Sequence, residues 1–202
     1  MSINTIIWDF DGVLMNSNEV RDKGFSAVLS HYPKEQVEAL LEYHQSNGGL
    51  SRYVKFKYFF EEIRKEPISQ KEINVWADKF SEIMLSNLIN PELLIQETIK
   101  FIRKNKKNYC HHIASGSDQN ELRKICKGTG ISDLFLSIHG SPQPKNQIVA
   151  DLISENGYNP SEVLLIGDSI NDFEAANVNG IFFKAYNNAK LETYTNSDLK
   201  FS

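Results

Sequence analysis

Two aspartates stand at the end of a short apolar stretch near the start of the sequence. Residues 5–17 read TIIWDFDGVLMNS, so Asp9 and Asp11 are separated by one phenylalanine and followed at once by Gly12. Two carboxylates this close repel one another unless a cation or a shared proton offsets their charge. A solvated surface turn can also hold such a pair, so the pattern alone leaves both a binding site and a plain turn open.

Further polar groups follow two later apolar runs. IASGSD carries Ser115 and Gly116 at the end of one run, and GDSIND carries Asp168 and Asp172 after another. In an open parallel sheet, ligands bind beyond the carboxyl ends of the strands, so these groups are predicted to meet at one edge. Carboxylates brought together in this way need a divalent cation, and an all-oxygen set suits Mg²⁺ better than zinc.

The same edge has the features of a phosphate site. A serine followed by glycine at the start of a helix offers a hydroxyl and free backbone N–H groups, and Lys145 in GSPQPKNQ adds a positive charge. An aspartate beside Mg²⁺ and a phosphate group can attack phosphorus and form an aspartyl-phosphate. A second aspartate can protonate the leaving oxygen and later deprotonate the attacking water. The residues therefore favour phosphoryl transfer.

Apolar runs of strand length alternate with segments of helix length along most of the chain. The runs are TIIW (5–8), NYCHHIA (108–114), EVLLIG (162–167) and GIFFKA (180–185). Segments 92–104 and 146–156 have helical periodicity, and Gly157 stands where a helix C-cap favours glycine. This alternation predicts an α/β fold with a doubly wound, Rossmann-like parallel sheet covered by helices on both faces.

One long segment interrupts the alternation. Between residues 18 and 88 no clear strand pattern occurs, and three stretches have helical periodicity: 35–44, 53–63 and 71–84. We therefore expect two domains, a core made of residues 1–17 and 89–202, and an inserted α-helical cap domain made of residues 18–88.

DFDGVL, IASGSD, Lys145 and GDSIND, in this order, resemble the four motifs of the haloacid dehalogenase superfamily of phosphotransferases. The helical insertion is placed like the cap of the phosphoglycolate phosphatase and β-phosphoglucomutase branch. The resemblance implies a Mg²⁺-dependent phosphoric monoester hydrolase acting on a small phosphomonoester, such as a sugar phosphate, through an aspartyl-phosphate. Members that cleave carbon–halogen bonds usually lack the second aspartate of the first motif, so Asp11 favours phosphate chemistry.

The resemblance assigns roles to the core residues by position. Asp9 would be the nucleophile and Asp11 the general acid and base. Ser115, Gly116 and Lys145 would hold the phosphoryl group that is transferred.

The metal site implied by the resemblance uses the same sheet edge. Asp9, the backbone carbonyl of Asp11 and Asp168 would ligate Mg²⁺, while Asp172 would support a metal-bound water or Lys145.

The insertion carries a candidate for substrate recognition. NGGLSRYVKF resembles a cap segment of β-phosphoglucomutase-like proteins in which an arginine contacts the distal part of the substrate. By that similarity Arg52 would bind the substrate from the cap side, with Lys55 as a second candidate.

Two other functions remain open. A phosphomutase uses the same residues and returns the phosphoryl group to another hydroxyl. Members of that branch often have an acidic residue where Gly167 stands, which favours hydrolysis here. A phospho-acceptor receiver module also pairs an aspartate with Mg²⁺, but the 202 residues and the helical insertion exceed what such a module needs.

Composition narrows the partners and the compartment. A net charge of −4 argues against a nucleic-acid partner held by a broad basic surface, and no apolar run approaches the length of a membrane span. Cys110 and Cys126 form no disulfide framework, and neighbouring His111 and His112 point to opposite faces if they lie in a strand, so we interpret these residues as packing groups. We expect a cytoplasmic monomer that binds a small phosphorylated molecule and neither nucleic acid nor membrane.

Overall fold

Five strands form one all-parallel sheet in the order β3-β2-β1-β4-β5 in the part of the chain that the computed structural model describes, residues 3–201. The strands are β1 (Thr5–Trp8), β2 (Cys110–Asp118), β3 (Ser137–Ser141), β4 (Val163–Gly167) and β5 (Phe182–Ala185). Thr5 pairs with Cys110 on one side and with Val163 on the other, so β1 is the central strand. The residue that follows β1 therefore emerges in the middle of the sheet edge.

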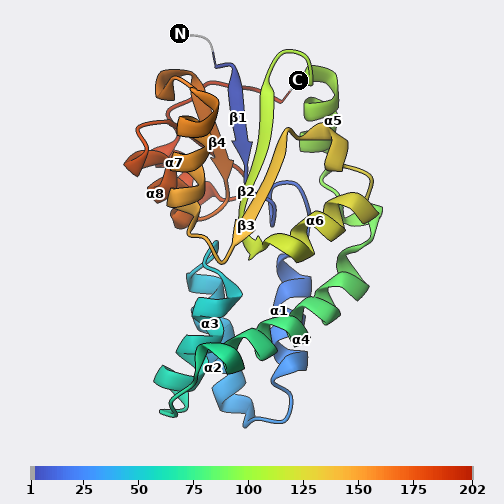
Figure 1. Cartoon of the computed structure of the whole chain (residues 1–202), viewed down its shortest axis with the longest axis vertical. Coiled ribbons are helices and arrows are strands. Elements are labelled where there is room, and N and C mark those ends of the chain that lie inside the picture. Colours follow the sequence, from blue (N-terminus) through green and yellow to red (C-terminus); the bar gives the residue numbers. More distant parts are fainter. Residues whose placement is uncertain (1–2, 202) are drawn as a thin grey trace.

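Helices cover both faces of this sheet (Figure 1). They are α5 (Gln96–Asn105), α6 (Gln119–Gly128), α7 (Lys145–Asn156) and α8 (Ile170–Val178). Ile6 and Trp8 of β1 pack in a cluster with α5 and α6, whereas Ile7 between them packs with α7 and α8. This alternation buries β1 completely, and it confirms the predicted doubly wound α/β fold.

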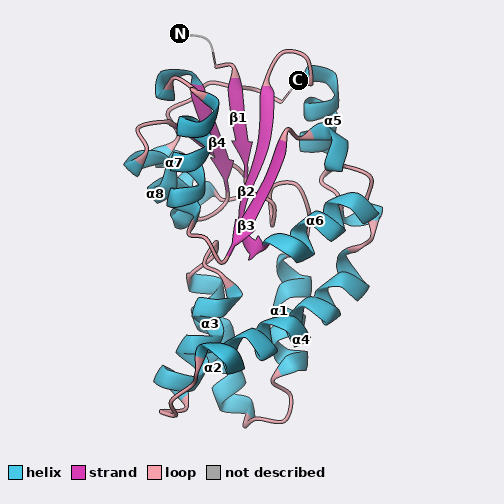
Figure 2. Cartoon of the chain, in the orientation of Figure 1, coloured by secondary structure: helices cyan, strands magenta, loops and turns pink. Residues whose placement is uncertain are grey.

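Residues 18–88 are helical and lie together beyond one end of the sheet, where Figure 2 shows helices and no strand. The helices are α1 (Asn18–Val28), α2 (Lys34–Ser46), α3 (Arg52–Tyr58), a π-helical turn (Phe59–Ile63) and α4 (Gln70–Leu88). Phe25, Phe56 and Phe80 form the centre of their shared apolar interior. The absence of strands was predicted, while the division into a core domain and a cap domain stays a prediction.

Several elements differ from the sequence-based expectation. The predictions did not include β3, α1, α6 or α8, and the helix expected from residue 92 begins at Gln96. Pro91 starts a short 3₁₀ turn instead (Pro91–Leu93), because Asn90 caps that turn through its side chain and the chain then extends at Leu94. Gly157 does end α7 in the left-handed conformation, with φ of 64°.

The two connections between the sheet and the insertion run side by side. The backbone N–H of Asn16 donates to the carbonyl oxygen of Leu93 at 2.8 Å, and the N–H of Ile95 donates to the carbonyl oxygen of Leu14 at 2.9 Å. The chain thus leaves the sheet and returns to it through one hydrogen-bonded pair of segments.

A buried carboxylate ties the insertion to the sheet side of the molecule. Glu121 on α6 is 2% exposed and accepts hydrogen bonds from Arg21 of α1 and Arg52 of α3. Burial alone would raise the pKa of Glu121, but the two guanidinium groups outweigh it and lower that pKa. One ionised side chain therefore holds helices α1 and α3 of the insertion.

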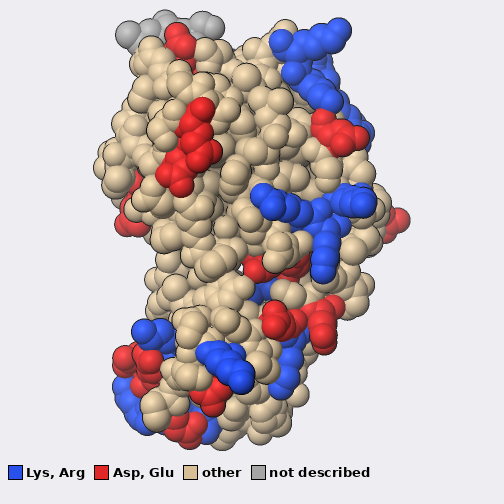
Figure 3. All heavy atoms as spheres, in the orientation of Figure 1, with Lys and Arg blue, Asp and Glu red and all other residues tan. Residues whose placement is uncertain are grey.

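Charged side chains on the visible face of the insertion alternate in sign (Figure 3). Exposed pairs such as Lys23 with Glu19 and Lys34 with Glu38 lie one helical turn apart. None of the helices within residues 3–201 is both long and apolar enough to span a bilayer.

We expect Glu121→Ala to destabilise the protein by about 3 kcal/mol or more, since it leaves two buried arginines without their shared carboxylate. Urea unfolding followed by circular dichroism measures the difference. The matched control is Glu19→Ala, which removes an exposed pair with Lys23 and should leave the midpoint of the urea transition nearly unchanged. Equal changes in the two variants would show that Glu121 does not hold the insertion in place.

Candidate active site

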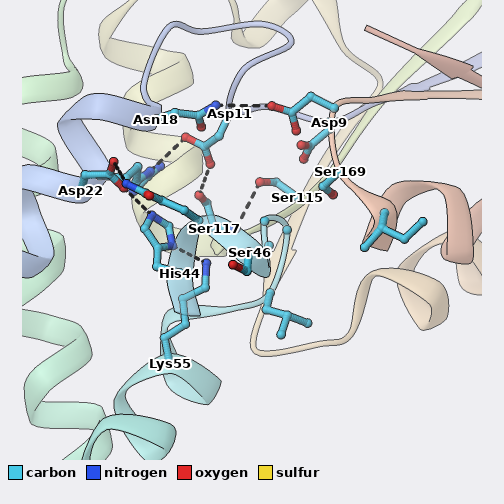
Figure 4. Close-up of a pocket in the computed structure, with 18 of the residues that line it drawn as sticks. Asp9, Asp11, Asn18, Asp22, His44, Ser46, Lys55, Ser115, Ser117 and Ser169 are labelled. Atoms are coloured by element: carbon cyan, nitrogen blue, oxygen red, sulfur yellow. Dashed lines mark hydrogen bonds and ion pairs between the residues drawn. The ribbon is translucent and has the colours of Figure 1, made fainter. Parts of the chain in front are cut away.

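The carboxyl ends of β1, β2 and β4 bring the predicted polar residues to one edge of the sheet (Figure 4). Asp9 follows β1 directly, and its backbone N–H donates to the carbonyl oxygen of Ile166 at 2.9 Å, so the sheet ladder fixes its position. Asp168 follows β4, and Ser115 lies where β2 shifts its register against β3, between Ala114 and Asp118. The topology thus produces the convergence that the sequence predicts.

A buried lysine joins two of the aspartates. The Lys145 ammonium donates to Asp9 Oδ1 at 2.8 Å and to Asp172 Oδ1. The other oxygen of Asp172 accepts from the backbone N–H of Ser169 at 3.0 Å and from its hydroxyl at 2.6 Å. Burial alone would lower the pKa of Lys145, but the carboxylates of Asp172 and Asp9 raise it, so the side chain stays charged.

Three carboxylates form a cluster that fits a hard divalent cation such as Mg²⁺. Oxygen atoms of Asp9, Asp168 and Asp172 all lie within 4.8 Å of one another. Burial, followed by the charge of Asp172, raises the pKa of Asp9 well above its usual range and raises that of Asp168 to about 7. The repulsion shows that Lys145 alone does not neutralise this cluster.

Asp11 points away from that cluster, toward the insertion. Its carboxylate accepts from the hydroxyls of Ser17 and Ser117 and from Arg21 Nε, at 2.5, 2.6 and 2.9 Å respectively. Burial alone would raise the pKa of Asp11, but the Arg21 charge and the two hydroxyls lower it to about 2. In this arrangement Asp11 is ionised, and the suggested ligation of metal by its backbone carbonyl stays a prediction.

Ser115 and Gly116 lie under a loop of the insertion. The Ser115 hydroxyl is buried and accepts from the backbone N–H of Ser117 at 3.1 Å. A methyl group at Gly116 would lie 2.1 Å from the carbonyl oxygen of Gly49, and one at Gly49 would lie 2.7 Å from Ser169 Oγ. Gly49 also has a φ of 82°, which side chains rarely adopt. Glycines on both sides therefore let this loop approach the sheet edge closely.

Sheet edge and insertion together enclose a pocket of about 550 Å³. Asp9, Asp168 and Ser115 line it from the sheet side, while Arg52 and Lys55 line it from α3. Arg52 lies over the Phe80 ring, and its guanidinium donates to Glu121 and to Ser81. Of the two cap-side candidates, Arg52 is thus bound by a carboxylate of the protein itself.

Sequence reasoning missed four residues around this pocket: Arg21, His44, Ser117 and Glu121. One signal was available for Arg21, which stands four residues after Ser17 and thus one helical turn beyond the first motif. For the others, the contacts join segments far apart in the chain, and no local pattern indicates them.

The histidines of β2 are packing groups, as predicted. His111 Nδ1 accepts from Trp8 Nε1 at 3.1 Å, whereas His112 lies within hydrogen-bonding distance of Ser137 and Tyr158. The two side chains belong to different surroundings, and within residues 3–201 the potential metal-binding cluster contains aspartates only.

A sequence model described as haloacid dehalogenase-like hydrolase matches residues 6–186 of the chain. A phosphoglycolate phosphatase of Haemophilus influenzae (strain 86-028NP) is 23% identical over 183 residues, which cover 86% of this chain and 80% of that protein.

Solved structures share the fold at low identity. A β-phosphoglucomutase from Clostridium difficile superposes with a TM-score of 0.77 at 19% identity, covering 98% of this chain and 91% of that one. CbbY from Rhodobacter sphaeroides, solved in complex with xylulose-(1,5)bisphosphate, gives a TM-score of 0.73 at 18% identity, covering 99% and 91%.

We expect Mg²⁺ to stabilise the protein more at about pH 8 than at about pH 5. The pKa of Asp168 is about 7 in the folded protein against 3.8 ordinarily, so stability present at low pH is lost as pH rises through 7 and the cluster ionises. A cation bound by the ionised cluster offsets that loss. Melting temperatures with Mg²⁺ and with chelator measure the difference, and Asp168→Asn should remove it. An equal shift at both pH values would contradict a cation site at Asp168.

Proposed function

The chain belongs to the haloacid dehalogenase-like hydrolase family, and we propose that it is a Mg²⁺-dependent phosphatase that hydrolyses a small phosphomonoester through an aspartyl-phosphate. The observation that carries this proposal is the pairing of buried Lys145 with Asp9, which lines the pocket together with Asp168. A carboxylate, a fixed cation and a set of metal-binding oxygens then surround one position for a phosphoryl group.

Asp9 is the proposed nucleophile. Lys145 donates to its Oδ1, and no hydrogen bond to Oδ2 is found among residues 3–201, so that oxygen can form the new bond to phosphorus. The bond from phosphorus to the leaving oxygen breaks in the same step. Ser115, Gly116 and Lys145 are proposed to hold the non-bridging oxygens, since they lie at the sheet edge beside the attacking carboxylate.

Asp9 and Asp168 are proposed to hold the metal, together with the backbone carbonyl of Asp11. When bound, Mg²⁺ would neutralise phosphoryl oxygens and so reduce their repulsion from Asp9. Both oxygens of Asp172 are occupied by Lys145 and Ser169, which supports the role of Asp172 as a residue that positions the lysine.

Asp11 is the proposed general acid and base. Its ionised state suits the second step, in which it takes a proton from the water that attacks phosphorus, while the bond from phosphorus to Asp9 breaks and inorganic phosphate leaves. The first step needs the protonated form, because the leaving oxygen must gain a proton. Asp11 must therefore move away from Arg21, whose charge keeps its pKa at about 2, before it can protonate that oxygen.

The insertion is proposed to act as a cap that encloses a small phosphorylated substrate within a single chain. The close contact of Gly49 with Gly116 supports this role, since it brings the insertion onto the phosphate-binding edge. Arg52 remains a proposed cap-side contact to the distal part of the substrate, which would have to compete with Glu121 for the guanidinium. No partner chain is needed to complete such a site, and we propose a cytoplasmic monomer.

One packing detail favours hydrolysis over phosphoryl transfer between sugars. A methyl group at Gly167 would lie 2.3 Å from Asp172 Cβ, so an acidic side chain there would displace Asp172 and with it the support of Lys145. The phosphoglycolate phosphatase relatives support the same choice.

Asp9→Asn should lower phosphate release by about a thousandfold or more while the fold stays intact, because the amide is a poor nucleophile. Release of inorganic phosphate from a panel of phosphorylated metabolites, with Mg²⁺ or with chelator, provides the measurement. Asp133→Asn, an exposed aspartate far from Asp9 in the sequence, is the matched control and should match wild type.

Substantial turnover by Asp9→Asn, or full wild-type activity in excess chelator, would refute the proposed mechanism. Transfer of the phosphoryl group to a second sugar hydroxyl without phosphate release would identify a mutase instead.

A further inference from the structure

The cations on the insertion side of the pocket differ in whether the protein neutralises them. Arg21 is paired with Asp11 and Glu121, and Arg52 is paired with Glu121. Lys55 is also buried, with 3% of its surface exposed, yet it forms no ion pair with a carboxylate within residues 3–201. Lys55 is thus the pocket-lining cation of α3 whose charge lacks a partner.

A short chain of hydrogen bonds orients the Lys55 ammonium. Lys55 Nζ lies 2.6 Å from His44 Nδ1, and His44 Nε2 lies 3.1 Å from Asp22 Oδ1. Gln45 holds the other oxygen of Asp22 at 2.9 Å. The contacts assign the proton of His44 to Nε2, which donates to Asp22, so that Nδ1 accepts from Lys55.

This chain uses only one of the three N–H donors of Lys55. Figure 4 shows Lys55 reaching up to His44 beneath Ser117 and Asp11, on the opposite side of the pocket from Asp9. Burial, the largest influence, lowers the pKa of Lys55 to about 7, and it lowers that of His44 to about 3, so His44 is neutral and cannot balance the lysine.

A second donor on the same pocket also lacks an acceptor. Arg21 Nη2 is buried and has no hydrogen-bond partner within the described residues, although Nε and Nη1 are both bound. Buried cationic donors without acceptors are unfavourable, and a negatively charged ligand would satisfy them.

We propose that Lys55, oriented by His44 and Asp22, binds a second acidic group of the substrate, on the side away from the phosphoryl group that is transferred. The preferred substrates are then phosphomonoesters that carry a carboxylate or a second phosphoryl group. This inference rests on the proposed phosphatase function and names the class of substrate for it. The pocket volume of about 550 Å³ accommodates either kind of molecule.

Two matched pairs of substrates test the proposal. Phosphoglycolate and hydroxyethyl phosphate differ by a carboxylate against a hydroxymethyl group, and fructose bisphosphate and fructose monophosphate differ by a second phosphoryl group. The ratio of kcat/KM within each pair is measured for wild type, Lys55→Met and Lys55→Arg. Lys57→Met is the control, because Lys57 lies on the same helix, exposed and near Glu61.

We expect wild type to prefer the acidic member of one pair by about tenfold or more, and the pair concerned identifies the acidic group. Lys55→Met should lose that preference, Lys55→Arg should retain part of it, and Lys57→Met should keep it whole. A preference unchanged in Lys55→Met, or no preference by wild type in either pair, would overturn the inference.

Binding measurements also compare the protein with and without Lys55→Met, and they do not require turnover. Calorimetric titration of phosphoglycolate and fructose bisphosphate into the Asp9→Asn protein, with and without Lys55→Met, should show weaker binding of the acidic ligand in the double variant. If wild type hydrolyses none of these compounds but this difference in affinity is found, the proposed hydrolysis fails while the anion site stands. Equal affinity with and without Lys55→Met would reject the anion site whatever the activity.

Discussion

Concentrated negative charge at the carboxyl edge of the sheet is the constraint on which the site depends. Asp9, Asp168 and Asp172 lie within one small cluster, and Lys145 is the cation that the protein places against it. The central position of β1 causes this concentration, because the residue that directly follows β1 lies between the ends of β2 and β4. The raised pKa values of Asp9 and Asp168 reflect the resulting repulsion, which a cation would relieve.

Charge is balanced differently on the side of the insertion. There Arg21 and Arg52 are paired with Asp11 and Glu121, which belong to the sheet side of the molecule, so pairing within the protein also holds the helices in place. Arg21 contacts both the proposed acid and base Asp11 and the anchoring residue Glu121. Because the same guanidinium contacts both carboxylates, the protonation of Asp11 and the position of α1 are physically connected. Lys55 has no carboxylate partner among these residues, so it remains available to bind an acidic group of the substrate.

The sequence predicted the features that depend on residues close together in the chain. The buried strands β1 and β4 read as continuous apolar runs, and the order of the motifs placed Asp9, Ser115 and Asp168 at one edge. The edge strand β3 was missed because SIHGS is half-exposed and lacks an apolar pattern. The partners of Asp11 and Arg52 were missed because Ser117 and Glu121 come from a different part of the chain, and only the fold brings them together. For the same reason, the sequence did not predict that Glu121 neutralises Arg52 while Lys55 has no carboxylate partner.

The paired connections at Asn16 with Leu93, and at Leu14 with Ile95, have an evolutionary consequence. Since the inserted segment leaves and re-enters the sheet at one place, its length and content can change without altering the register of any strand. Exchange of the segment between related genes would therefore preserve the phosphate-binding edge and replace the surface that faces it. A lineage built in this way can acquire new metabolites as substrates while inheriting one reaction chemistry, as long as the exchanged segment supplies cations in place of Arg21 and Arg52 for Asp11 and Glu121.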